Sequence, residues 1–438
     1  MAPTPPPLEH TYADALPKLS VEWEATTWPE PRLVALNETL AEELGLDVPW
    51  LRTDAGVNWL LGQNVAGTRA QAYAGHQFGH FSGVLGDGRA LLLGELVTPE
   101  GRRVDLHLKG SGRTPFSRGG DGRAALGTML REYLVSESMH ALGIPTTRAL
   151  AVATTGETIT RQGPVPGAVL CRVAASHLRV GTFQLAAAAD DAASLRALTD
   201  YTLARHHRAA VSGEDPALAL LDAVATAQAT LVAQWMLVGF VHGVLNTDNI
   251  TLSGETIDYG PCAFLDRYDP STSFSSIDHA GRYRYDHQPS VMVWNLARFA
   301  EALLPVMSGS SEARVHAAQD VLSRMQETYR SAFHEGMARK FGHSSASDGA
   351  EITAELADLA ERGVDFTEAF DPLPGVNPVA IARNHLVQEA VDAADDGDLA
   401  PFHALLAVLR DPWHEPADPT LKGPAPSGTE PFISYCGT

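Results

Sequence analysis

A short polar segment between an apolar stretch and a long loop constrains this chain more than any other feature. Residues 242–260 read His-Gly-Val-Leu-Asn-Thr-Asp-Asn-Ile-Thr-Leu-Ser-Gly-Glu-Thr-Ile-Asp-Tyr-Gly. The β-prone residues within 250–257 flank a central Ser-Gly, so we expect a strand, a turn and a second strand there. Asp248 and Asn249 precede this hairpin and Asp258 follows it, which would bring hard oxygen ligands near one point. Such an arrangement suits Mg²⁺ held beside the phosphates of a nucleotide.

The order of His242, a loop, Asn249 and Ile-Asp-Tyr-Gly is similar to the catalytic loop and Asp-Phe-Gly segment of protein kinases and aminoglycoside phosphotransferases. Kinases carry the catalytic Asp two residues after that His, where this chain has Val244. A catalytic base therefore has to come from another position, and Asp248 is the nearest candidate.

Length and charge narrow the class of protein. The chain has 438 residues, of which 45% are hydrophobic and 19% charged, as in an ordinary globular protein with one large bilobal core or two to three domains. Its net charge of −21 argues against a nucleic-acid backbone or an anionic membrane as the main partner. A nucleotide is compatible with this charge because it needs only a local cluster of cations.

The first residues and the number of cysteines indicate the cellular compartment in which the protein is expected. The start, Met-Ala-Pro-Thr-Pro-Pro-Pro, lacks the basic and apolar regions of a signal peptide, and no later run approaches 18 uniformly apolar residues. Cys171, Cys262 and Cys436 are too few for a disulfide framework and match no zinc-binding spacing. We therefore expect a cytoplasmic protein.

Lys109 is isolated in a chain whose basic residues are mostly arginine. Residues 86–89, Gly-Asp-Gly-Arg, lead into a predicted β-hairpin with strands at 90–97 and 104–108, and Lys109 comes at its end. A Gly-rich turn lets backbone N–H groups approach a phosphate, and a kinase-like fold places its phosphate-binding lysine at this point. A surface lysine is the alternative interpretation of Lys109 alone. The polar loop 110–123, rich in Gly and Arg, either wraps an anion or lies in solvent.

Further charged residues follow on predicted regular elements. The apolar spacing predicts a helix over 124–142, whose Glu132 and Glu137 could each pair with Lys109. Helical geometry puts Glu137 in the middle of the apolar face and Glu132 on its flank, so it does not choose between them. Strands are predicted at 148–153, 158–161 and 168–173. Arg172 and Arg179 fit either a phosphate clamp or solvated charges.

The elements divide into a strand-rich part and a helical part, which predicts an α+β fold. We expect an N-terminal extension over 1–60 with a helix at 33–44, a β-rich region over 61–180, a helical region over 181–410 and a tail over 411–438. Helices are predicted at 195–210, 216–240, 290–304, 312–341, 350–362, 379–394 and 400–409.

Several blocks together resemble the selenoprotein O family, whose bacterial members are known as YdiU. They are Tyr73-Ala-Gly-His-Gln-Phe-Gly-His-Phe, Gly86-Asp-Gly-Arg, the stretch 106–123, His242-Gly-Val-Leu-Asn-Thr-Asp-Asn and Thr256-Ile-Asp-Tyr-Gly-Pro. The resemblance runs from about residue 10 to the C-terminus. It implies a bilobal protein-kinase-like fold with a β-rich N-lobe, a helical C-lobe and extra C-terminal helices. It also implies ATP bound in an inverted orientation and AMP transferred to Ser, Thr or Tyr hydroxyls of proteins, self-modification included; UMP transfer is described for some bacterial members.

The resemblance assigns roles at the matching positions. It implies Asp248 as proton acceptor, Asn249 and Asp258 as ligands of Mg²⁺ or Mn²⁺, and Glu132 as the partner of the lysine. Residues implied to contact the nucleotide are Gly86, Gly88, Arg89, Lys109, Asp121, Gly122, Arg172, Arg179 and Asp258.

The chain departs from the family at one cysteine position. Phe274 occupies the position of a family cysteine that can pair with the C-terminal one, so we expect Cys436 to form no stable intramolecular disulfide, with Cys262 as the only substitute partner. Cys171 is expected to be an inert buried thiol.

Two rival functions fit the sequence besides AMP transfer. They are a phosphotransferase acting on a small molecule and a catalytically silent nucleotide-binding scaffold.

Overall fold

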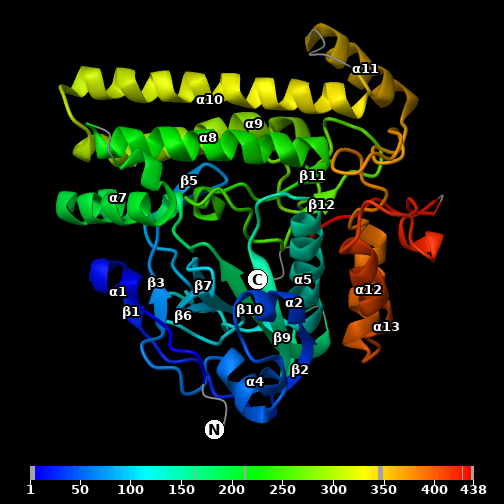
Figure 1. Cartoon of the computed structure of the whole chain (residues 1–438), viewed down its shortest axis with the longest axis horizontal. Helices are drawn as coiled ribbons and strands as arrows, with labels where there is room; N and C mark the ends of the chain where they lie inside the picture. The colour runs from blue at the N-terminus through cyan, green and yellow to red at the C-terminus, as the bar shows by residue number, and fades with distance from the viewer. Residues whose placement is uncertain (1–4, 162, 212–213, 344–348, 427, 436–438) are drawn as a thin grey trace.

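The computed structural model describes residues 5–161, 163–211, 214–343, 349–426 and 428–435. Within these residues the protein is a mixed α and β structure built on an antiparallel sheet, with long helices stacked above the sheet and shorter ones at its side (Figure 1). The strand order in the large sheet is β1-β3-β6-β7-β10-β9-β2, and β8 pairs with β10. The bounds are β1 Ser20–Glu22, β2 Arg32–Leu36, β3 Arg69–Gln71, β6 Ala90–Val97, β7 Arg103–Lys109, β8 Ala124–Ala125, β9 Arg148–Thr160 and β10 Pro164–Ala174.

The predicted hairpin before Lys109 is confirmed as β6 and β7. Strand β7 alternates between apolar and polar side chains, and Leu106 and Leu108 are fully buried in one of the two apolar clusters. Because side chains alternate across a strand, His107 and Lys109 share the opposite face. On the neighbouring strand β10, Arg172 lies directly opposite His107. The register therefore gathers buried polar groups on one face of the sheet.

Helix α5, Leu126–Ala141, packs against β9 and β10 and confirms the helix predicted over 124–142. Its apolar side chains, among them Met129, Leu130 and Tyr133, belong to the larger apolar cluster. Helices α12, Asn384–Asp395, and α13, Ala400–Leu409, pack against α5 from outside (Figure 1). The sheet therefore holds α5 from one side and the C-terminal helices hold it from the other.

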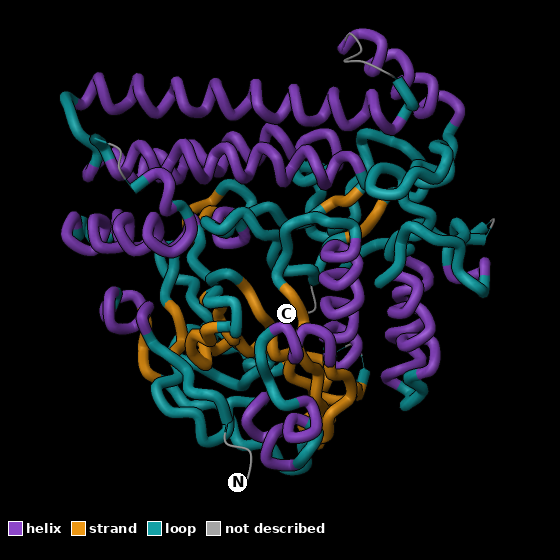
Figure 2. Tube along the Cα trace, viewed as in Figure 1, coloured by secondary structure: helices purple, strands orange, loops and turns teal. Residues whose placement is uncertain are grey.

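The helical part begins where the sheet ends. Its helices are α6 Val180–Ala188, α7 Ala192–His206, α8 Pro216–Leu237, α9 Gln288–Leu303, α10 Ser311–Lys340 and α11 Gly349–Arg362. Helix α8 packs against α9 and α10, and these helices run side by side (Figure 2). Among the described helices, α8 is long and apolar enough to cross a membrane by length and composition, although 56% of its most apolar stretch is buried inside the protein. It is not uniformly apolar, because it contains Asp222 and Gln228.

Short elements complete the described chain. They are α1 Thr11–Ala15, α2 Glu38–Glu43, α3 Val48–Leu51, α4 Asp54–Leu60, β4 Gly75–Gln77, β5 His80–Ser82, β11 Phe240–Val241 and β12 Ala263–Phe264. The described residues also form short 3₁₀ turns, one of which, Thr247–Asn249, lies at the site.

Two local predictions are wrong. The helix expected over 33–44 is divided into β2 and α2, because Asn37 donates its backbone N–H to Leu150 and caps α2 by accepting from the N–H of Leu40. The hairpin expected within 250–257 does not form: Thr251 bridges to Arg179 and Thr256 bridges to Thr146. In addition, the strands expected at 148–153 and 158–161 are one continuous strand, β9.

Candidate active site

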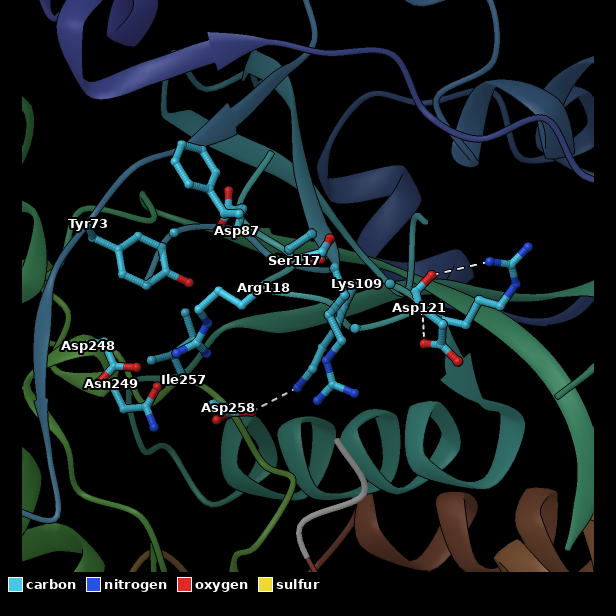
Figure 3. A pocket seen from close by; sticks show the side chains of 18 of the residues that line it. Tyr73, Asp87, Lys109, Ser117, Arg118, Asp121, Asp248, Asn249, Ile257 and Asp258 are labelled. Carbon is cyan, nitrogen blue, oxygen red and sulfur yellow. Dashed lines mark hydrogen bonds and ion pairs between the residues drawn. The ribbon is translucent and has the colours of Figure 1, made fainter. Parts of the chain in front are cut away.

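A cavity of about 430 Å³ lies between the polar face of the sheet and the 242–260 segment (Figure 3). Every residue that the resemblance assigned to the nucleotide, the metal or the proton lines it, whereas Glu132 lies behind Lys109. Those lining residues are Gly86, Gly88, Arg89, Lys109, Asp121, Gly122, Arg172, Arg179, Asp248, Asn249 and Asp258.

Lys109 is buried and joins the two sides of the cavity. Its Nζ lies 2.5 Å from Oε2 of Glu132 and 2.8 Å from Oδ1 of Asp258. Figure 3 shows the second contact as a dashed line that reaches from Lys109 to Asp258. Burial alone would raise the pKa of Asp258, but the ammonium of Lys109 outweighs it and holds that pKa below its usual range.

The two glutamates of α5 have different partners. Glu132 accepts from Lys109 through Oε2 and from Arg172 Nη1 through Oε1, the latter at 3.2 Å. Glu137 instead holds Arg148 with two bonds of 2.6 and 2.8 Å. The choice that helical geometry left open is therefore made by the structure in favour of Glu132.

Arg172 and Arg179 are 4% and 6% exposed, so the alternative of solvated surface charges is wrong. Their Nε atoms are buried and have no hydrogen-bond partner. Arg179 lies over the ring of Tyr73 at 4.5 Å and donates through Nη1 to the carbonyl of Asp248 at 3.2 Å. Buried guanidinium groups with free donors, in a cavity wall, are suited to an anion such as phosphate.

The glycine-rich loop forms one end of the cavity. Gly86 has a φ of +69°, and a Cβ there would lie 2.4 Å from the ring of Phe116, so only glycine fits. Asp121 stands nearby and accepts two bonds from Arg161, at 2.9 and 3.1 Å. Although partial burial acts against it, these bonds lower the pKa of Asp121. The Asp121 carboxylate is thus an ionised acceptor at the cavity's edge.

The opposite wall is made by a segment with little regular structure. Asp248 and Asn249 lie on the 3₁₀ turn, where Asn249 Nδ2 donates to the carbonyl of Val244 at 3.0 Å. Asp258 has a φ of +67°, a left-handed conformation that is uncommon for residues with a side chain and that Asp tolerates better than most. His242 supports it from behind, because its Nε2 lies 2.9 Å from the carbonyl of Ile257.

Asp248 has the surroundings of a general base. Its Oδ1 is buried without a partner, and its Oδ2 accepts only a long 3.4 Å bond from Gln77. Burial raises the pKa of Asp248 to about 6, with Asp258 adding to the rise and Arg179 opposing it. A Cβ on Gly75 would lie 3.0 Å from Asp248 Oδ1, so glycine lets β4 lie against the carboxylate.

The residues expected to hold a metal fit a hard divalent cation. Because the amide nitrogen of Asn249 is used by the backbone, its carbonyl oxygen is left as an acceptor on the cavity side, beside the ionised Asp258. Among the residues that the structure describes, no group of three or more His, Cys, Asp or Glu side chains could hold an ion. Two oxygen ligands and the nucleotide's own phosphates are how proteins commonly bind Mg²⁺.

The two cysteines that the structure describes are free, buried thiols. Cys171 and Cys262 are buried, and burial raises the pKa of each thiol to about 12, in agreement with the expectation for Cys171. Cys436 lies outside the described residues. Phe274 is buried, and its carbonyl accepts from the N–H of Ser434 at 2.7 Å, so the tail packs beside this loop through backbone and apolar contacts.

The model of one protein family, described as protein adenylyltransferase SelO, matches residues 8–375. The chain belongs to the SelO family. It is 50% identical to a protein nucleotidyltransferase YdiU of Mycolicibacterium smegmatis, covering 98% of each chain, and 50% identical to one of Mycolicibacterium paratuberculosis with the same coverage. A third YdiU, from Cereibacter sphaeroides, is 50% identical over 98% of this chain and 99% of its own. The family membership expected from the sequence blocks is confirmed.

Sequence reasoning missed several residues that line or support this SelO-family cavity. Asp87 stands between two predicted glycines, and His107 shares a strand face with Lys109, so alternation along β7 could have found it. Gln77 reaches Asp248 from another part of the chain, and no local pattern indicates that contact.

Proposed function

We propose that this SelO-family chain transfers AMP from ATP to a Ser, Thr or Tyr hydroxyl of a protein. The attacking hydroxyl oxygen forms a bond to the α-phosphorus, the bond from that phosphorus to the β-bridging oxygen breaks, and pyrophosphate leaves. The observation that carries the proposal is the arrangement of one cavity, with buried cations on one side and, on the other, the carboxylate of Asp248, whose Oδ1 has no hydrogen-bond partner.

Lys109, Arg172 and Arg179 are assigned to the β- and γ-phosphates. Their charges are held in place by protein partners, so little reorganisation is needed when phosphate binds. Gly86 and Gly88 bring backbone close to the nucleotide, and Arg89, Asp121 and Gly122 line the rest of its path. With the terminal phosphates held there, the α-phosphorus is the one left for attack.

Asp248 is assigned as the base that takes the hydroxyl proton. A pKa of about 6 leaves it ionised at neutral pH yet basic enough to accept a proton. Asn249 and Asp258 would hold Mg²⁺ or Mn²⁺, which when bound neutralises negative charge on the phosphate oxygens. Arg179 contributes by fixing the backbone of Asp248 through its carbonyl.

The proposal includes a bilobal protein-kinase-like arrangement with the nucleotide inverted. Residues 61–180 would form the N-lobe, 181–410 the helical C-lobe, 1–60 an extension on the N-lobe and 411–438 a tail. In support, the large sheet ends at Ala174, α6 begins at Val180, and the cavity takes residues from both sides of that point. Val244 at the kinase base position supports a chemistry in which Asp248 takes over.

Parallel assays with α-labelled and γ-labelled ATP test the function. We expect α-label on the protein itself or on an added protein, in the presence of Mg²⁺ or Mn²⁺, and at least about a hundredfold slower transfer with Asp248→Ala. Transfer of γ-label alone would make the chain a phosphotransferase, and ATP binding without transfer would make it a scaffold. A third arm with α-labelled UTP measures whether UMP is also transferred.

A further inference from the structure

A pair of stacked imidazole rings lies behind the phosphate-binding arginines. The ring centroids of His107 and His177 are 3.9 Å apart, the planes differ by 15°, and both side chains are buried. A carboxylate flanks each ring: Asp87 Oδ2 lies 3.1 Å from Nε2 of His107, and Asp105 Oδ2 lies 3.1 Å from Nδ1 of His177. The proposed function uses none of these side chains.

The hydrogen bonds of His107 fix its tautomer. Nη2 of Arg172 lies 3.3 Å from Nδ1 of His107, and a guanidinium can only donate, so Nδ1 is an acceptor. The ring hydrogen is therefore on Nε2 and is donated to Asp87, whose carboxylate can only accept. The two hydrogen bonds that join Arg172, His107 and Asp87 therefore run in one direction, from the guanidinium to the ring and from the ring to the carboxylate.

The surroundings keep this ring neutral. Burial lowers the pKa of His107 to about 4, with Arg172 and Arg179 lowering it further and Asp87 opposing them. The stacked His177 has a pKa lowered well below its ordinary value by burial, so it adds no charge. The lone pair on Nδ1 thus stays available to Arg172 at neutral pH.

Arg172 is held at its two terminal nitrogens and free at the third. Nη1 donates to Glu132 and Nη2 to His107, whereas Nε is buried without a partner. Asp87 also faces the second arginine, because its Oδ1 lies 3.9 Å from Nη2 of Arg179. One carboxylate next to the glycine-rich turn therefore stands behind both arginines.

We propose that His107, oriented by Asp87, is the positioning residue that directs the guanidinium of Arg172 at the nucleotide's terminal phosphates. The proposal rests on the phosphate role given to Arg172 in the proposed function. Without the acceptor on His107, Arg172 keeps only Glu132, which Lys109 also uses. A long side chain with one fixed contact has more conformational freedom to lose when ATP binds.

Two substitutions of His107 separate positioning from packing. His107→Asn places a carbonyl oxygen near the position of Nδ1 and can still accept from Arg172. His107→Gln places its polar atoms near the position of Nε2, so it can pair with Asp87 but leaves Arg172 without this acceptor. Both remove the ring and its stacking on His177, so they share any loss that comes from packing.

The measurement is calorimetric binding of ATP and of AMP to the full chain. We expect His107→Gln to weaken ATP binding roughly tenfold to a hundredfold, the effect of losing a hydrogen bond to a charged group. His107→Asn should bind ATP within about threefold of the unsubstituted protein, and AMP, which lacks the terminal phosphates, should bind equally to all. Equal loss of ATP affinity in both variants, or loss in neither, would overturn the proposal.

Two further results distinguish failure of the positioning role of His107 from failure of the proposed function. If Arg172→Gln bound ATP as tightly as the unsubstituted protein, the phosphate role itself and the positioning role would both be lost. If α-label were never transferred but the Gln and Asn variants differed as expected, adenylyl transfer would fail and the positioning role would stand. Nitrogen NMR of the unsubstituted protein needs no variant to fold: the ring in contact with His177 should carry its hydrogen on Nε2, and a hydrogen on Nδ1 would overturn the proposal.

Discussion

The cavity has two walls that the chain builds in different ways. The strand wall carries Lys109 and Arg172 on adjacent strands, with Glu132 of α5 behind them. The loop wall carries Asp248 and Asp258 on a segment whose only regular piece there is a 3₁₀ turn. Lys109 and Arg172 of the strand wall pair with Glu132, and Asp258 of the loop wall pairs with Lys109, whereas Asp248 has no ion-pair partner among the described residues and its Oδ1 accepts no hydrogen bond.

This difference between the walls indicates that the strand wall is suited to binding and the loop wall to chemistry. Groups on strands are held by backbone ladders and by a packed core on the other side, so they suit binding of a fixed anion. In the proposed function, groups on the loop wall would exchange partners with a metal, a hydroxyl and a proton, and the unpartnered oxygen of Asp248 suits such an exchange. The following predictions test whether binding belongs to the strand wall and chemistry to the loop wall.

The largest expected effect is on the loop wall. Asp248→Ala removes the base, so single-turnover AMP transfer should fall by roughly 10²- to 10⁴-fold. ATP affinity measured by calorimetry in the presence of Mg²⁺ should change little, because Asp248 is assigned to no phosphate. A matched loss of ATP affinity would contradict the division between the walls.

Metal binding separates two carboxylates of the same wall. Asp258→Ala removes an anionic ligand and should weaken Mn²⁺ binding in the presence of ATP by tenfold or more, on the order of the losses seen at metal sites. Asp248→Ala is the matched control and should retain the metal, as measured by Mn²⁺ paramagnetic titration. Comparable losses in the two variants would mean that Asp248 is itself a ligand.

The two glutamates of α5 test the strand wall. Glu132→Gln should reduce kcat/KM for ATP roughly tenfold to a hundredfold, because Lys109 and Arg172 share that carboxylate. Glu137→Gln breaks the buried pair with Arg148 instead, and should lower the free energy of unfolding by about 3–5 kcal/mol with ATP affinity unchanged. Reversal of these two outcomes would reassign the lysine partner.

The pH dependence of the transfer rate tests the loop wall alone, through the ionisation of Asp248. A base with a pKa raised to about 6 must be ionised to act, so the rate of transfer should rise with pH through that value and level off above it. Rates measured at saturating ATP should lack this rise in Asp248→Asn. A pH profile that is flat between 5 and 7 would exclude Asp248 as the base.

The smallest effect is a gain in stability. The pKa of Asp248 rises from its ordinary value of 3.8 to about 6 in the folded protein. The protonated form therefore adds to the free energy of unfolding; this contribution is fully present below pH 3.8 and is lost as the pH rises through about 6. At neutral pH, ionised Asp248 thus lowers the free energy of unfolding by roughly 3 kcal/mol. Asp248→Asn should raise the melting temperature at pH 7 and not at pH 4, by calorimetry; equal shifts at both would point to packing.

The strand wall was predictable from local patterns and the loop wall was not. Alternation along β7 and the apolar spacing of α5 located Lys109 and the helix of Glu132, because strand and helix periodicity follow from backbone geometry. The 250–257 segment has the composition of a hairpin, but Thr251 and Thr256 each form an isolated bridge to a distant residue, Arg179 and Thr146 respectively. Long-range pairing of this kind leaves no local signal, so the pattern indicated Asp248 and Asp258 as site residues but predicted the wrong structure to bring them together.

The same limit applies to supporting contacts. Wheel geometry could not choose between Glu132 and Glu137, since that choice depends on where Arg148 and Lys109 meet α5 in three dimensions. Gln77 reaches Asp248 across 171 positions of sequence. Residues that act through one another across such separations become visible only once the chain is folded.

The bond between Lys109 and Asp258 has a thermodynamic consequence. A divalent ion arriving at Asp258 meets a carboxylate already shared with an ammonium 2.8 Å away, and repulsion between the cations weakens its binding. In the proposed function, the terminal phosphates of ATP would attract the same ammonium and so release the carboxylate. Ion and nucleotide should therefore bind with positive cooperativity, each raising the affinity of the other by the same factor. The ion pair would thus keep free magnesium out of the protein until ATP arrives with it.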